Sequence, residues 1–172
     1  TIGPGDLPPE VTQAVLPPPA AGHDGLAVAV RPARGAAPPR IVLAGEVPRG
    51  VAYAAYDLLE RAGCRWNYPA QDPADPEVVP RKDALALEAG TRAVASPFRF
   101  RIANGSAWLF EMDLAAARVQ LDWVLKCRYN AVGWQSESKT PLASQYRRMR
   151  DAGLIDELDR RGMLLHGPPP RR

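Results

Sequence analysis

The segment Leu121-Asp-Trp-Val-Leu-Lys-Cys-Arg-Tyr-Asn-Ala-Val-Gly-Trp134 joins the end of a helix pattern to a complete strand pattern. Asp113 suits the N-cap of this helix, because its carboxylate can accept a hydrogen bond from a free backbone N–H. The apolar residues after it recur every three or four positions, as on one face of an α-helix. These residues are Leu114, Ala117, Leu121, Val124 and Leu125. The sequence therefore predicts a helix that leads directly into a strand over 130–134.

The same rhythm extends on both sides of this segment. A strand with strict alternation is expected over 97–102, a helix over about 142–161 with a break near Gly153, and a third strand over 163–166. Alternating strands and helices predict parallel strands with right-handed crossovers. The strand starts recur about every 32 residues, close to the roughly 31 per unit of a (β/α)8 barrel. We therefore expect residues 96–172 to form the first βα units of an incomplete, truncated TIM barrel.

The first half of the chain has a different organisation. Residues 24–30 and 40–44 have the composition of two strands, and further short strands are expected at 64–68, 77–79 and 84–87. A helix starts at Pro48, whose missing N–H is not needed in a first turn, and ends near Gly63. Its apolar face comprises Val51, Ala54, Ala55, Leu58, Leu59 and Ala62. We expect a small α+β accessory domain over 23–95, preceded by a proline-rich extended lead-in over 1–22. The fold class is α/β.

Charge and composition exclude several classes of function. The 22 basic and 19 acidic residues are spread along the chain without a concentrated basic stripe, so we expect no nucleic-acid partner. No run of 18 apolar residues occurs, so no membrane partner is expected. No P-loop, GxGxxG or HExxH motif occurs, and neither Cys64 nor Cys127 lies in a CxxC pair; no cofactor and no metal site are expected. No signal peptide is visible, and the choice between secreted and cytoplasmic stays open.

Two segments carry a resemblance to known enzymes. The first is Pro48-Arg-Gly-Val-Ala-Tyr-Ala-Ala-Tyr-Asp-Leu-Leu-Glu-Arg-Ala-Gly-Cys-Arg-Trp66 with Glu77-Val-Val-Pro80. It resembles the end of the N-terminal accessory domain of bacterial alpha-glucuronidases and beta-N-acetylhexosaminidases. The second is Ser96-Pro-Phe-Arg-Phe-Arg101 with residues 121–132, which resembles the first barrel strand and helix of the same glycoside hydrolases. The resemblance covers about residues 24–166, and the Gly-Cys-Arg-Trp element favours the alpha-glucuronidase-like side.

The resemblance implies a role in carbohydrate metabolism. In these enzymes the accessory domain performs no chemistry, the carboxyl-terminal rim of the barrel binds the sugar, and the catalytic carboxylates come from later strands. The chain is therefore expected to be the N-terminal fragment of a glycoside hydrolase, with no catalytic residue of its own and no activity alone. Its expected partners are an oligo- or polysaccharide and the missing barrel portion. The tail over 167–172 departs from the family pattern and is interpreted as a truncation.

Three residues are candidates for substrate binding. The resemblance implies that Arg101, near the end of the first barrel strand, donates hydrogen bonds to sugar hydroxyls, which suits a guanidinium group. Trp134, at the end of the second strand, is a candidate to stack on a sugar ring, and His166 ends the third strand at the same rim. Each also has a structural interpretation: a surface arginine, a core tryptophan and a histidine satisfied by its neighbours. Glu111 is the acidic residue nearest this rim, where a loop or capping role suits it better than catalysis.

Two other functions stay open from the sequence. The chain is alternatively a stand-alone α/β module that binds a glycan or a protein through the sheet of its first domain. The third interpretation is a different small α/β enzyme whose active site carries no recognisable motif. Reading the coding sequence beyond residue 172 separates the first interpretation from these two, because a barrel enzyme requires further βα units and a pair of carboxylates.

Overall fold

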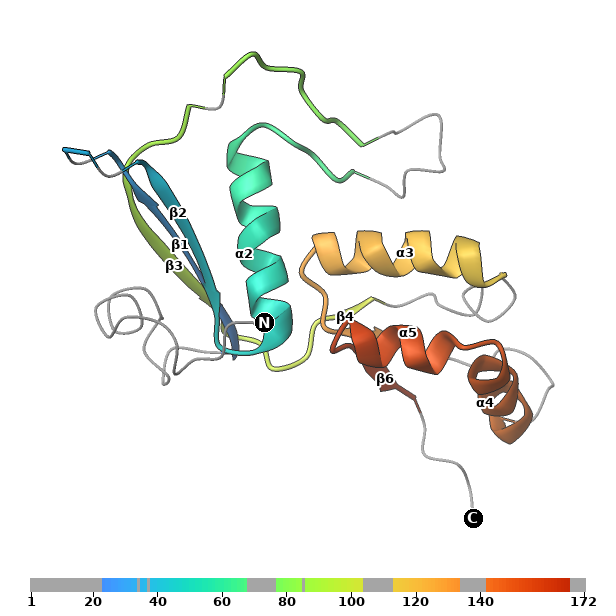
Figure 1. Ribbon diagram of the computed structural model, residues 1–172. Coiled ribbons are helices and arrows are strands. Elements are labelled where there is room, and N and C mark those ends of the chain that lie inside the picture. Colours follow the sequence, from blue (N-terminus) through green and yellow to red (C-terminus); the bar gives the residue numbers. More distant parts are fainter. Residues whose placement is uncertain are drawn as a thin grey trace. The chain divides into compact units, whose positions relative to one another are not determined.

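The computed structural model describes residues 23–33, 35–36, 38–67, 77–84, 86–103, 113–133 and 142–167 (Figure 1). The chain divides into two compact units, Thr1–Arg65 with Val78–Arg99 and Trp66–Glu77 with Phe100–Arg172. The second unit therefore begins close to the expected boundary at residue 96, and it also includes a segment from the middle of the expected accessory domain. The expected lead-in over 1–22 lies outside the described residues.

The sheet of the first unit is antiparallel and has the order β2-β1-β3. It consists of β1 (His23–Arg31), β2 (Arg40–Gly45) and β3 (Gly90–Ser96). The strands predicted over 24–30 and 40–44 are confirmed. The strand predicted over 84–87 is wrong, since the third strand lies at β3 instead. The strands expected at 64–68 and 77–79 are reduced, in the described residues, to one antiparallel bridge between Arg65 and Val78.

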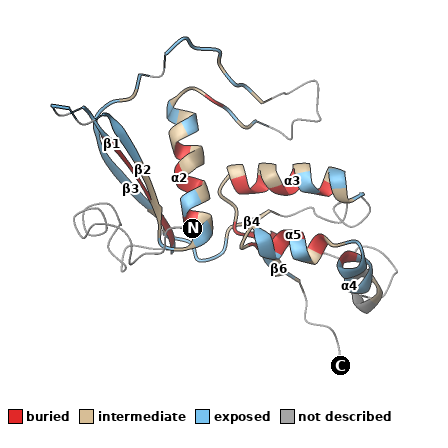
Figure 2. Ribbon diagram, in the orientation of Figure 1, coloured by how far each residue is buried: buried red, intermediate tan, exposed pale blue. Residues whose placement is uncertain are grey.

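Helix α2 (Pro48–Arg61) covers one face of this sheet. Arg92 and Val28 are directly paired across β3 and β1, so their side chains point to the same face. Arg92 Nε lies 3.5 Å from Asp57 Oδ1 of α2, which places the helix on that face. The buried residues of α2 are Gly50, Tyr53, Ala54 and Asp57, among exposed and half-buried positions (Figure 2). The predicted apolar face is therefore largely wrong: Ala54 is buried, but Val51 and Leu59 are 42% and 40% exposed, because the side of the helix that bears Gly50 approaches the sheet. A Cβ atom at Gly50 would lie 2.7 Å from the carbonyl oxygen of Gly25, so this glycine allows the close approach.

The second unit has a parallel sheet with the order β4-β5-β6. Its strands are β4 (Ile102–Ala103), β5 (Ala131–Gly133) and β6 (Leu164–His166). Helix α3 (Leu114–Lys126) connects β4 to β5, and α4 (Leu142–Asp151) and α5 (Leu154–Arg160) lie between β5 and β6. The predicted alternation of helices with parallel strands is confirmed. The first strand is much shorter than the predicted 97–102, because pairing starts only at Ile102.

One apolar core holds the second unit together. It contains Ala117, Leu121 and Val124 of α3, Val132 of β5, Met149 of α4, Leu154 and Leu158 of α5, and Met163. The predicted inner face of α3 is therefore correct, and Asp113 Oδ1 caps the helix by accepting from the Ala116 N–H at 2.8 Å. Gly153, with φ +77°, separates α4 from α5 at the predicted break. The fold is mixed α/β, as expected from the sequence.

Candidate functional site

The carboxyl ends of the parallel strands define the candidate site. Gly133 pairs with His166 and Val132 with Ala103, so the last residues of the strands lie at one edge of the sheet. Ligands of α/β proteins bind at this edge, because the connections that follow the strands surround it. The connections after β4 and β5 lie outside the described residues, and with them the candidates Trp134 and Glu111.

His166 lies where the sequence predicts it, at the end of β6, and it is exposed. A neutral imidazole both donates and accepts hydrogen bonds, which suits contact with sugar hydroxyls. Hydrolysis of a glycosidic bond needs a pair of carboxylates about 5 to 10 Å apart. The described strand ends at this edge are Ala103, Gly133 and His166, and none of them is acidic. This part of the edge is able to contact a ligand and carries no catalytic pair.

Arg101 does not lie at this edge. It directly precedes β4, so it belongs to the amino ends of the parallel strands, and the predicted position near the carboxyl end is wrong. Its Nε donates a hydrogen bond to the Arg128 carbonyl oxygen at 2.7 Å. Arg128 has a left-handed backbone with φ +62°, which is uncommon for a residue with a Cβ atom. The guanidinium group therefore supports the turn between α3 and β5, and sugar binding by Arg101 stays a prediction without support from its position.

Asn130 is a structural residue that the sequence did not single out. It is 1% exposed, and its Oδ1 accepts a hydrogen bond from the Arg101 N–H at 2.8 Å. Its N–H donates to the Arg101 carbonyl oxygen at 3.1 Å, and its carbonyl oxygen accepts from the Leu164 N–H at 2.9 Å. Asn130 thus connects the starts of all three parallel strands. The sequence signal that could have indicated this role is a polar residue directly before the apolar run Ala-Val-Gly.

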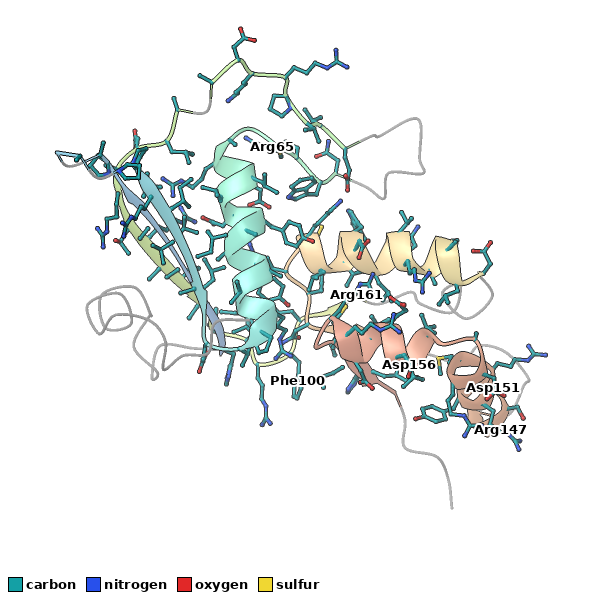
Figure 3. The ribbon with its side chains drawn as sticks, viewed as in Figure 1. Arg65, Phe100, Arg147, Asp151, Asp156 and Arg161 are labelled. Carbon is teal, nitrogen blue, oxygen red and sulfur yellow. The ribbon has the colours of Figure 1, made fainter. Side chains whose placement is uncertain are left out.

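Glu157 lies within a group of arginines on α5 and α3. This carboxylate is buried, and it accepts hydrogen bonds from Arg118 at 2.8 Å, Arg160 at 2.7 Å and Arg161 at 2.5 Å. Arg161, which Figure 3 labels, also has a guanidinium nitrogen 2.7 Å from Asp122 Oδ1 of α3. The hydrogen bond from Arg118, followed by that from Arg161, lowers the pKa of Glu157 to about 2. This carboxylate stays ionised at neutral pH, and it holds α5 to α3.

A second group fixes Trp66 and Glu77 to the end of α3. Lys126 Nζ lies 2.5 Å from Glu77 Oε1 and 4.8 Å from the centre of the Trp66 ring, which is the geometry of a cation–π contact. The Trp123 indole N–H donates to the Trp66 carbonyl oxygen at 3.2 Å. These contacts explain why Trp66 and Glu77 belong to the second unit. The ammonium group already has an anionic and an aromatic partner, so we assign it a structural role.

Three further observations concern ligands and relatives. Within the described ranges, no three His, Cys, Asp or Glu side chains lie together in a way that could hold a metal ion, and Cys64 and Cys127 are free thiols. None of the helices in the described part of the chain has the length and apolarity needed to cross a membrane. Comparisons with protein-family models, curated proteins and solved structures found no match.

Proposed function

We propose that the chain is the front part of a carbohydrate-active glycoside hydrolase of the alpha-glucuronidase-like type: an accessory domain followed by the first βα units of a (β/α)8 barrel. The observation that carries the proposal is the order of the parallel sheet. Strands β4, β5 and β6 are neighbours in the order in which they occur in the chain. A barrel is built by this stepwise addition, whereas a doubly wound sheet reverses its direction.

The edges of this sheet support the same proposal. Among the described residues, β4 and β6 each pair with β5 alone, so each has one edge without a partner strand. Exposed strand edges attract further strands, and a closed barrel removes them. A fourth parallel strand beside β6 and a last strand beside β4 would complete the cylinder. Leu164, which is 45% exposed on β6, would then pack against the added units.

In this proposal the sugar binds at the carboxyl edge that ends in Gly133 and His166. His166 contributes a hydrogen bond to a hydroxyl group of an oligo- or polysaccharide. The acid and base carboxylates belong to strands beyond β6, because glycoside hydrolysis needs two of them and none ends a described strand. Residues 1–172 therefore bind a sugar weakly at most and do not hydrolyse it.

The test compares the chain with its extension. The coding sequence beyond residue 172 is read, and the longer product is assayed on aryl glucuronides and aryl N-acetylglucosaminides. We expect further βα units with an Asp or Glu pair, activity in the longer product and none in residues 1–172. Hydrolysis by residues 1–172 alone would contradict the proposal. A coding sequence that contains no further βα units beyond residue 172 would contradict it as well.

A further inference from the structure

The chain leaves the first unit after Arg65 and returns to it at Val78, and these two residues are paired with each other. The Arg65 N–H donates to the Val78 carbonyl oxygen at 2.9 Å, and the Val78 N–H donates to the Arg65 carbonyl oxygen at 3.0 Å. The Arg65 side chain, labelled in Figure 3, donates to the carbonyl oxygens of Glu60 and Cys64 at 2.8 and 2.7 Å. The bridge between Arg65 and Val78 is therefore fixed to the carboxyl-terminal end of α2.

The residues directly inside this bridge, Trp66 and Glu77, belong to the second unit and are attached to the end of α3. Lys126 Nζ lies 2.5 Å from Glu77 Oε1 and 4.8 Å from the centre of the Trp66 ring. The Lys126 and Glu77 side chains are only 20% and 16% exposed, so water and salt screen their attraction less than at the surface. The Trp66 carbonyl oxygen also accepts hydrogen bonds from the Trp123 indole at 3.2 Å and the Cys127 thiol at 3.8 Å. On each side of the bridge, one peptide bond thus separates an attachment to α2 from an attachment to α3.

The bridge lowers the entropic cost of the contacts with Lys126. Ten residues lie between Trp66 and Glu77 in the sequence, and in an open chain the entropy of closing this loop opposes their meeting at one lysine. The bridge between Arg65 and Val78 has already closed the loop, so both groups reach Lys126 preorganised. When the first unit unfolds, the bridge opens and this cost returns. Because coupled equilibria are reciprocal, the contacts with Lys126 stabilise the bridge in turn.

We propose that Arg65, Trp66, Glu77 and Val78 form a clamp that couples the stability of the two units. Helix α3 has its full stability only while the first unit is folded, and loss of the contacts with Lys126 weakens the bridge at the end of α2. The clamp is a conformational device of the fold, since it transmits a change in the first unit to the helix that precedes β5. The inference depends on these contacts alone, so it is independent of the sugar-enzyme proposal.

The test is hydrogen–deuterium exchange of the full chain, measured by mass spectrometry on peptides from α2 and α3. A54G weakens the first unit, because Ala54 is completely buried in α2 and glycine is unfavourable within a helix. G50A is a second perturbation of the same unit, since its Cβ atom would lie 2.7 Å from the Gly25 carbonyl oxygen. We expect either variant to accelerate exchange in α2 and, through the clamp, to accelerate exchange at the end of α3 by about fivefold or more.

The same substitutions are then combined with K126M, which removes the ion pair and the cation–π contact of the clamp. In this background we expect A54G to change exchange in α3 by less than about twofold, as for independent sites. K82M is the matched control background, because Lys82 is an exposed lysine of the first unit, and there the full effect on α3 should persist. Circular dichroism confirms that each variant folds. The proposal is overturned if neither A54G nor G50A alone changes exchange in α3, or if K126M transmits their effect as fully as K82M does.

Discussion

Asn130 Oδ1 accepts a hydrogen bond from the backbone N–H of Arg101, 29 residues earlier in the chain, at 2.8 Å. The backbone carbonyl oxygen of Asn130 also accepts a hydrogen bond from the Leu164 N–H, at the start of β6. One buried residue thus connects β4 and β6 to β5, through its side-chain oxygen on one side and its backbone carbonyl on the other. This arrangement gives the first prediction.

N130A should destabilise the second unit by about 1–3 kcal/mol, because it leaves the Arg101 N–H without its side-chain acceptor in a part-buried position. The free energy of unfolding is measured by urea denaturation. N67A is the matched control, since Asn67 is exposed and should change stability by less than about 0.5 kcal/mol. Equal effects of the two substitutions would contradict the role of Asn130.

E157Q should lower the melting temperature at neutral pH and lose this effect in acid. The pKa of Glu157 is lowered from 4.5 to about 2 in the folded protein, so its ion pairs stabilise the fold above about pH 4.5. That contribution is lost as the pH falls towards 2, where the folded carboxylate also takes up its proton. Melting curves of wild type and variant should therefore converge on acidification. D159N, an exposed position on the same helix, is the control variant, and its melting temperature should stay close to that of the wild type at neutral pH.

K126M should destabilise the attachment of Trp66 and Glu77 to α3 by about 0.5–2 kcal/mol, because it removes a cation–π contact and an ion pair between half-buried groups. Hydrogen exchange at the amides around Trp66 is expected to accelerate, and urea denaturation gives the free energy. K82M serves as the control, since Lys82 is exposed. If Lys126 were a solvated surface charge, the two variants would behave alike.

G153A should cost about 1 kcal/mol, because Gly153 has φ +77°, a left-handed backbone that a Cβ atom disfavours. Steric crowding is not the cause, since a Cβ atom there would meet Leu114 Cδ2 at an ordinary 3.7 Å. G153N should be better tolerated than G153A, because asparagine visits the left-handed region more readily. Thermal melting of the two variants distinguishes backbone strain from steric crowding. If crowding were the cause, G153N would have the lower melting temperature, because asparagine is larger than alanine.

H166A should abolish the sugar binding that we propose at the carboxyl edge of the parallel sheet. Saturation-transfer NMR with methyl glucuronide and with N-acetylglucosamine as probes measures the contact directly. H23A is the control, because His23 is also exposed and lies on β1 of the other unit. Loss of signal in both variants, or in neither, would argue against a role for His166.

The sequence by itself determined the elements whose signals are local. The capping carboxylate of Asp113 and the three-four spacing after it define α3, and Pro48 and Gly63 delimit α2. The left-handed requirement at Gly153 fixed the break between α4 and α5, and the alternation of helices with strands predicted a parallel sheet. Each of these features depends on residues within a few positions of one another, so periodicity and capping reveal them.

Tertiary structure decided what depends on distant partners. The third strand of the first unit forms at Gly90–Ser96 and not at 84–87, because pairing with the central β1 determines its place. Arg101 lies before β4 because Asn130 and the Arg128 carbonyl hold its backbone and side chain there. Glu157 lies among arginines and is buried, although its neighbours in sequence indicate a surface helix. Such positions are set by hydrogen bonds and charges between segments far apart in the chain, which no local pattern encodes.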